Sequence, residues 1–223
     1  MDAFRGIGLV LSRPRLWPLC MAPTLAGLGL YVLAAWWLLT HPPAAFTEWQ
    51  ESIAFLNALG QVFYVLLVLV GLALLSVVVM SAFIGVIFDP LSREVEREVS
   101  GEFPPACPYP WKTLFADSLQ RLGFNALLGL LAFGLGFIPV VGTIAAVAIA
   151  GVIGLLDYSS VGYLRRGKLF PVQRREMFAR LDRPSVLFGL VVGLAALVPG
   201  LGLLLGPGFI AGGTLLARRK LTQ

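Results

Sequence analysis

The chain has 223 residues, of which 58% are hydrophobic and only 13% are charged, and its net charge is +5. Soluble domains carry about 25% charged residues, so this composition excludes an ordinary soluble protein. The sequence predicts one integral membrane domain over residues 1–223, all-α in class, with no room for a separate soluble domain.

The N-terminal segment, residues 1–18, is amphipathic and is expected to lie along the membrane surface. Its apolar stripe at helical spacing consists of Phe4, Ile7, Gly8 and Leu11. The first apolar block, residues 19–40, is longer than the apolar part of a cleaved signal, and the HPPAAF that follows is a poor cleavage site. We therefore expect a retained first span.

A loop without Lys or Arg, HPPAAFTEWQES, leads to the second predicted span, residues 53–88. Basic residues accumulate on the cytoplasmic side of a membrane, so this loop is expected outside and both termini inside. Asp89 and Pro90 then predict the start of an amphipathic helix that ends at Gly101. The segment from Trp111 to Leu122 predicts another in-plane helix.

Two later apolar blocks, residues 122–158 and 186–217, are both flanked by basic segments and broken at their centres. Each block must therefore enter and leave on the same side, which predicts two helical hairpins. The predicted tips contain residues that disfavour helix interiors: Pro139, Gly142, Pro199, Gly200 and Gly202.

The arms of these hairpins, counted over their apolar residues, have 13 to 16 residues, or about 20 to 24 Å of helix. A hydrocarbon core is about 30 Å thick. We therefore expect two partly inserted hairpins beside two full spans. The competing interpretation is six complete, short and tilted spans, because mismatch costs only fractions of a kcal/mol per Å.

Several motifs in the sequence resemble known functional motifs but do not indicate a catalytic or cofactor site. GYLRRGKL lacks the Ser or Thr and the preceding strand of a phosphate-binding loop, so we expect no ATP hydrolysis. GLVVG and GFIAG are expected to pack the two arms of the second hairpin together, with a dimerisation face as the alternative. A single His41 and two distant cysteines predict neither a metal site nor a cofactor, and no enzyme or nucleic-acid partner is indicated.

No charged residue occurs from Leu122 to Leu156. Charge-coupled carriers place ionisable groups near the membrane midplane, so passive flow is favoured over proton coupling if a solute moves. Broken helices would supply polar groups at the hairpin tips, because a helix N-terminus carries free N–H donors.

Several patterns follow one another along the chain: SRPRLW, FDPLSREVEREVSG, FIPVVGT, LLDY, a basic loop and LVPGLG. Their order resembles that of the CysZ-type sulfate permeases, whose wider family includes the etoposide-induced membrane proteins. The resemblance implies two spans plus two partly inserted hairpins, a homo-oligomer, a bacterial inner-membrane location and sulfate uptake.

In the family, Pro-Gly-Leu-Arg at the start of the first span holds the anion. The corresponding residues here are Pro14, Arg15, Leu16 and Trp17, so Gly is replaced by Arg15 and the motif Arg by Trp17. The resemblance implies an anion site of Arg13, Arg15, Leu16 and Trp17, with Arg13 or Arg15 replacing the charge one turn earlier. Alternatively, both arginines are ordinary cytoplasmic anchors and Trp17 lies at the interface.

The sequence thus predicts a passive permease or channel for a small anion, sulfate by analogy, in the lipid bilayer. The alternative is a membrane-structural or partner-binding protein that wedges shallow hairpins into the inner leaflet.

Overall fold

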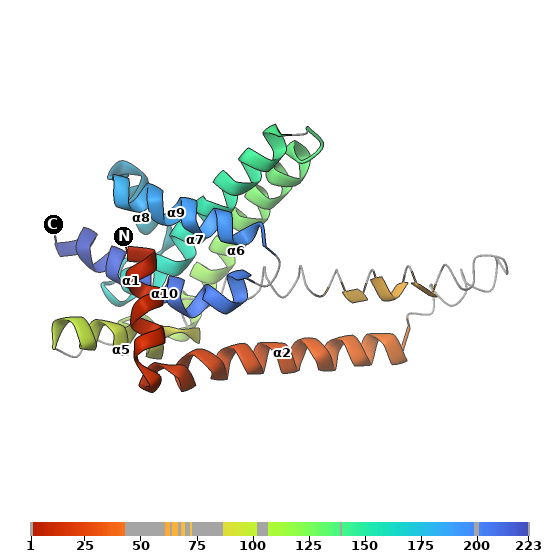
Figure 1. Cartoon of the computed structure of the whole chain (residues 1–223), viewed down its shortest axis with the longest axis horizontal. Coiled ribbons are helices and arrows are strands. Elements are labelled where there is room, and N and C mark those ends of the chain that lie inside the picture. Colours follow the sequence, from red (N-terminus) through yellow and green to blue (C-terminus); the bar gives the residue numbers. More distant parts are fainter. Residues whose placement is uncertain are drawn as a thin grey trace. The chain divides into compact units, whose positions relative to one another are not determined.

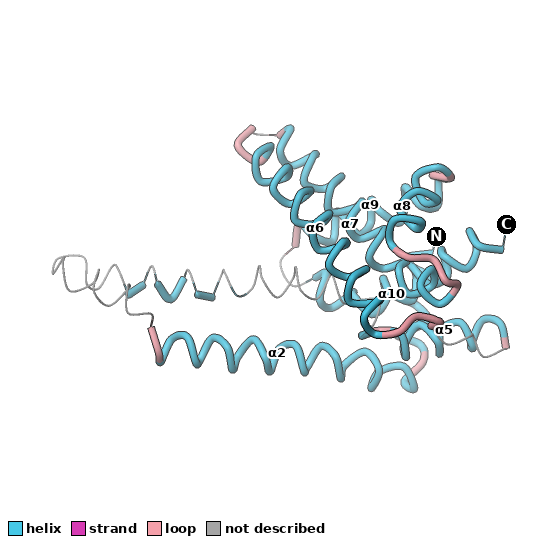
Figure 2. Tube along the Cα trace, turned by 180° about the vertical axis from the view of Figure 1, so that it is seen from behind, coloured by secondary structure: helices cyan, strands magenta, loops and turns pink. Residues whose placement is uncertain are grey.

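The structure, a computed structural model, describes residues 2–42, 61–62, 64–66, 68–69, 72, 87–101, 107–138, 140–198 and 201–222. Every regular element in these ranges is a helix, which confirms the predicted all-α class (Figure 1; Figure 2). The chain divides into two compact units, one of residues 1–23 with 81–223 and one of residues 24–80.

Three helices of the described residues are long and apolar enough to cross a membrane. They are α2 (Trp17–Thr40), which follows a short 3-10 turn at Pro14–Leu16, α6 (Trp111–Leu135) and α7 (Val141–Arg165). The predicted first span, residues 19–40, lies within α2. The predicted second span, residues 53–88, lies mostly outside the described residues.

Helices α6 and α7 run side by side and form the first predicted hairpin (Figure 1; Figure 2). Each has 25 residues, or about 37 Å of helix, which exceeds the roughly 30 Å of a hydrocarbon core. The prediction that these arms are only 13 to 16 residues long is wrong, because both helices continue beyond their apolar residues. Their depth of insertion stays a prediction.

The segment from Trp111 to Leu122 is not a separate surface helix, contrary to prediction. It forms the first half of α6, since no proline interrupts the segment after Trp111. Asp117, Arg121 and Asn125 follow one another at four-residue spacing and are all buried. One buried polar stripe therefore continues into the apolar part of the same helix.

The second hairpin consists of α9 (Arg183–Ala196) and α10 (Leu201–Thr222), preceded by the short helix α8 (Phe170–Ala179). α9 starts at Asp182, whose side chain accepts a hydrogen bond from the Ser185 backbone N–H, as a helix N-cap does. Pro199 and Gly200, two of the predicted tip residues, lie outside the described residues.

Helix α5 (Asp89–Ser100) ends at Gly101, as predicted, and the positive φ of 73° there suits glycine. Its N-cap is Phe88 rather than Asp89. Helix α1 (Asp2–Ser12) packs its Ala3, Gly6 and Val10 inward and leaves Phe4 and Leu11 exposed. Within the predicted apolar stripe, Phe4 and Leu11 therefore face away from the protein, whereas Ile7 packs against the apolar cluster.

The small-residue motifs do not pack the arms of the second hairpin against each other, and that prediction is wrong. Gly189 and Gly193 of α9 pack on α7, where a Cβ on Gly193 would lie 2.2 Å from the Val147 carbonyl oxygen. Gly208 and Gly212 of α10 pack instead on α1. Each motif therefore joins its own arm to a different neighbouring helix.

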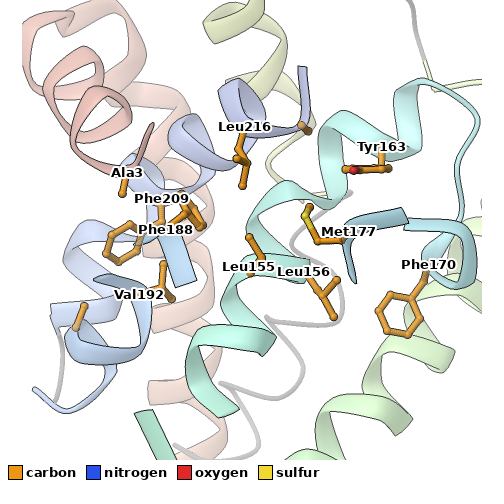
Figure 3. Packing of buried hydrophobic residues seen from close by; sticks show 12 residues of the cluster. Ala3, Leu155, Leu156, Tyr163, Phe170, Met177, Phe188, Val192, Phe209 and Leu216 are labelled. Atoms are coloured by element: carbon orange, nitrogen blue, oxygen red, sulfur yellow. The ribbon is translucent and has the colours of Figure 1, made fainter. Parts of the chain in front are cut away.

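The main apolar cluster lies where α1, α7, α9 and α10 meet (Figure 3). Phe188 and Phe209 pack edge to face there, with 6.4 Å between ring centroids, and Ala3 lies beside them. Leu156 and Met177 extend the cluster from α7 to α8. This core packs the two hairpins against each other near the ends that are predicted to face the cytoplasm.

Candidate functional site

The start of α2 contains the four residues predicted to hold an anion. Arg13 precedes the 3-10 turn and has an exposed side chain, 58% accessible, with its Nη2 atom 3.5 Å from a Glu98 oxygen. Arg15 is exposed, and the described residues include no hydrogen-bond or ion-pair partner for it. Two guanidinium groups therefore meet solvent beside a helix N-terminus, an arrangement that favours anions.

Leu16 and Trp17 have different surroundings from the two arginines. Leu16 is fully buried, and its backbone N–H donates to the Arg13 carbonyl oxygen, so Leu16 does not face a solvent anion. The Trp17 indole N–H donates to the Val10 carbonyl oxygen, 3.1 Å away, while the ring is half exposed. Trp17 therefore joins α2 to α1 and does not supply the charge of the arginine that the family motif has there.

The tip of the first hairpin is tightly turned. Val140 has φ 66° and ψ −56°, a strained conformation for a β-branched residue, and its side chain is 71% exposed. A Cβ on Gly142 would lie 2.5 Å from the Leu135 carbonyl oxygen, so only glycine fits. Pro139 lies outside the described residues.

The structure does not bring this tip to the two arginines. Within their compact unit, the α6–α7 turn and the start of α2 lie at separate ends (Figure 1; Figure 2). At the second hairpin, Gly202 lies in the first turn of α10 in open space. The predicted site residues therefore form separate groups rather than one cluster.

The structure buries several charged residues that the sequence places outside the apolar blocks or at their ends. One group, the Arg121 cluster, joins α6, α7 and α8. Its members are Asp117, Arg121, Asn125, Asp157 and Gln173. Arg121 lies 3.3 Å from Asp157 and donates to Gln173 over 2.9 Å, and Asn125 donates to Asp157 over 3.0 Å.

A second buried group, the Arg165 cluster, joins α5, α7 and α10. Its members are Asp89, Ser92, Glu96, Arg165, Arg166 and Thr214. Glu96 binds Arg165 at 3.2 Å and Arg166 at 3.0 Å, and Ser92 lies 2.7 Å from the Thr214 hydroxyl. Mutual pairing offsets the cost of burying these charges.

A third polar group ties the end of α10 to α9 and α1. Asp182 lies 3.2 Å from Lys220 and 3.5 Å from Arg219, and Arg219 also binds Asp2 at 2.6 Å. Burial would raise the pKa of Asp182, but the hydrogen bonds from Ser185 and Lys220 outweigh it and lower the pKa below its ordinary value.

The signal that could have revealed the Arg121 cluster is Asp157, a carboxylate at the end of a long apolar block. A charge in that position needs a partner, and Arg121 and Asn125 are the polar residues at the start of the same apolar block. Among the described residues, no group of three His, Cys, Asp or Glu side chains could hold a metal ion.

The helices, the broken hairpin and the basic start of α2 can be compared with known proteins. The family model described as sulfate transporter CysZ/etoposide-induced protein 2.4 matches residues 2–207. The chain belongs to this family. No curated relative matches the chain.

Membership in the sulfate transporter CysZ/etoposide-induced protein 2.4 family makes this a membrane protein related to sulfate transporters. The match covers α1, the start of α2, the first hairpin and most of the second. It therefore includes both exposed arginines and the Arg121 cluster, whereas Thr214, Arg219 and Lys220 lie beyond it.

Proposed function

We propose that the chain is a passive permease for sulfate-like anions, with Arg13 and Arg15 collecting the anion at the start of α2. The observation that carries the proposal is the pair of exposed guanidinium groups beside a helix N-terminus in a chain of this family. Positive charge at a helix N-terminus favours a dianion.

The contact between Arg13 and Glu98 does not prevent this role. A carboxylate oxygen of Glu98 lies 3.5 Å from the Arg13 guanidinium, and the Arg13 side chain is 58% exposed. An exposed pair of this kind is worth about 0.2–1 kcal/mol, so an arriving dianion can compete with Glu98.

Passive flow is proposed rather than proton coupling. The apolar stretch from Leu122 to Leu156 has no ionisable residue, whereas proton-coupled carriers need such groups at midplane. The buried Asp157 is held by Arg121 and Asn125, which favours a fixed charge. On this proposal the protein catalyses no reaction and hydrolyses no ATP.

The proposal includes an arrangement in the membrane. The chain would lie in the bacterial inner membrane as a homo-oligomer, with both termini cytoplasmic. The hairpin tips at Gly142 and Gly202 would line or gate the path from within the bilayer, since helix N-termini at mid-depth can bind anions. Partial insertion of the hairpins belongs to this proposal as well.

Radiolabelled sulfate uptake into proteoliposomes tests the proposal. The Arg13→Ala/Arg15→Ala variant should lose most of the saturable flux of the wild type. The matched control is Lys112→Ala/Arg183→Ala, which removes two exposed charges elsewhere and should keep it. Equal flux from wild-type and empty liposomes, with folded insertion confirmed, would contradict the proposal.

Such a negative result would favour a membrane-structural role instead. Phe4 and Leu11 on α1 are 57% and 67% exposed and face away from the protein. An apolar helix face of this kind suits insertion into one leaflet.

A further inference from the structure

We propose that the hollow between α6 and α8 binds an anionic phospholipid, with its phosphate at Arg174 and one acyl chain along α6. The hollow measures about 290 Å³ and is lined by Gln120, Gly123, Phe124, Leu127, Phe170, Pro171 and Arg174. The inference does not depend on sulfate flux, because it concerns a different face from the start of α2.

The hollow lies across the boundary between polar and apolar parts of α6. Gln120 and Arg121 end the charged half of this helix, and the uncharged stretch begins at Leu122. Gly123 and Leu127 lie one and two turns further along the same face as Gln120. A ligand here therefore meets a polar group at one end and apolar groups at the other, as a phospholipid requires.

Arg174 supplies the positive charge at the polar end. Its guanidinium carbon lies 5.2 Å from the Phe124 ring centroid and 5.8 Å from that of Phe170. These cation–π contacts hold the group in place without neutralising it. Among the described residues no carboxylate pairs with Arg174, so its charge is available to a phosphate.

The neighbouring Arg121 cannot take this role. It is 2% exposed and already binds Asp157 and Gln173. Arg121 also lies over the Phe170 ring at 4.6 Å and fixes that ring from its own side of the cluster. The Arg121 cluster thus supports one wall of the hollow through Phe170, and Arg174 is the exposed cation that lines the hollow.

The lining favours a lipid over a free anion. Beyond Arg174 and the Gln120 amide, the wall consists of glycine, proline, leucine and two phenylalanines. A dianion such as sulfate would lose hydration there without enough donors to replace it. A volume comparable to about ten water molecules has room for a phosphate and the first methylenes of one chain.

The outer surface of α6 continues the apolar end of the hollow. Leu127, Leu130 and Leu131 are 65%, 69% and 52% exposed. An acyl chain extending from the hollow would lie along these side chains.

A second hollow, of about 510 Å³, lies on the other side of Pro171 and is a weaker candidate. Its lining includes Arg175 and Arg180 but also Glu176, which binds Lys168 at 2.7 Å. A carboxylate in the wall opposes a phosphate, and no residue of the apolar stretch of α6 reaches it. The charge pattern therefore selects the first hollow.

Native mass spectrometry of the detergent-purified protein, titrated with phosphatidylglycerol and with phosphatidylcholine, tests the headgroup. The wild type should retain phosphatidylglycerol more tightly. Arg174→Ala should weaken that binding about fivefold and leave phosphatidylcholine unchanged. Arg183→Ala, which removes an exposed arginine from α9, should change neither.

A pair of glycine variants on α6 tests the acyl end. A Cβ at Gly123 or at Gly129 meets nothing within 4 Å, so both positions accept a side chain without disturbing the helix. Gly123→Leu fills the hollow and should weaken binding of phosphatidylglycerol. Gly129→Leu, which lies outside the hollow, should not.

Three outcomes would overturn the proposal. They are equal retention of the two lipids by the wild type, unchanged lipid binding in both Arg174→Ala and Gly123→Leu, and an Arg174-dependent affinity for inorganic sulfate that displaces the lipid. The last outcome would make the hollow a free-anion site. Elution volume and helical circular dichroism confirm that each variant is folded.

Discussion

Arg121 of α6 lies 3.3 Å from Asp157 of α7, and both side chains are at most 4% exposed. Asp117 lies 3.7 Å from the same guanidinium, so one arginine compensates two buried carboxylates. Gln173 adds a hydrogen bond from α8. One cation therefore links both arms of the first hairpin to α8.

The two ends of this ion pair should respond differently to substitution. Arg121→Met leaves Asp117 and Asp157 buried without their cation and should lower the free energy of unfolding by about 3–5 kcal/mol. Asp157→Asn keeps Arg121 beside Asp117 and Gln173 and should cost about 1–3 kcal/mol. Unfolding in mild detergent, followed by circular dichroism, measures both.

The double variant Arg121→Met/Asp157→Asn separates pairing from packing. If the pair is coupled, the double variant loses less stability than the sum of the losses in the two single variants. Additive losses would show that Asp157 does not depend on Arg121.

Matched glycine substitutions test the packing of α7 on α9. A Cβ at Gly193 would lie 2.2 Å from the Val147 carbonyl oxygen, whereas a Cβ at Gly129 meets nothing within 4 Å. Gly193→Ala should therefore destabilise by about 1–3 kcal/mol. Gly129→Ala should be neutral or stabilising by up to about 1 kcal/mol.

Thermal unfolding in detergent compares these two variants directly. The same loss at both positions would indicate a general effect of altered glycine content, and would contradict close packing of α7 on α9. Gly189→Ala serves as a repeat of the test, since its Cβ would lie 3.1 Å from the Gly151 carbonyl oxygen.

The sequence predicts the helical class and the hairpins because apolar length and basic flanks are local properties. It does not predict how far α6 runs, since hydropathy falls at Arg121 although the helix continues. The partners of Gly189 and Gly208 could not be predicted either. Small residues indicate close approach but do not identify the helix that approaches.

The residues of the candidate site also divide into those that the sequence indicates and those that it does not. The resemblance of Pro14–Trp17 to the family motif indicates the site at Arg13 and Arg15, whereas the Arg121 cluster depends on contacts between residues 36 positions apart. No local pattern specifies such a pairing. The carboxylate at Asp157 indicates only that a partner is needed.

Asp182 should make stability depend on pH. Its folded-state pKa is lowered, so its contribution is present above the unfolded-state value of about 3.9 and is lost as pH falls through the folded value. The difference in melting temperature between wild type and Asp182→Asn should therefore be present at pH 7 and vanish in strong acid.

The effect should be small, because the Asp182 side chain is 38% exposed and is screened by salt. A difference that persists undiminished below the folded pKa would contradict the ionic origin. Asp182→Ser, which keeps an N-cap oxygen without charge, separates capping from ion pairing.

Val140 should be a strained residue at the first hairpin tip. A φ of 66° is unfavourable for a β-branched residue, and its side chain is exposed. Val140→Gly should raise the free energy of unfolding by about 1 kcal/mol, whereas Val141→Gly, at the first position of α7, should bring no such gain. Equal losses in the two variants would contradict strain at the tip.

Glu98 should compete with sulfate for Arg13. The carboxylate lies 3.5 Å from the guanidinium, so its replacement by the neutral Glu98→Gln frees the cation. If Arg13 collects the anion, the half-saturating sulfate concentration in proteoliposome uptake should fall by a factor of about 1.4 to 5, the range equivalent to an exposed ion pair. Glu94→Gln, which removes a carboxylate paired with Arg97 instead, should leave it unchanged. An equal change in both variants would indicate a general surface-charge effect and remove Glu98 and Arg13 from the proposed anion site.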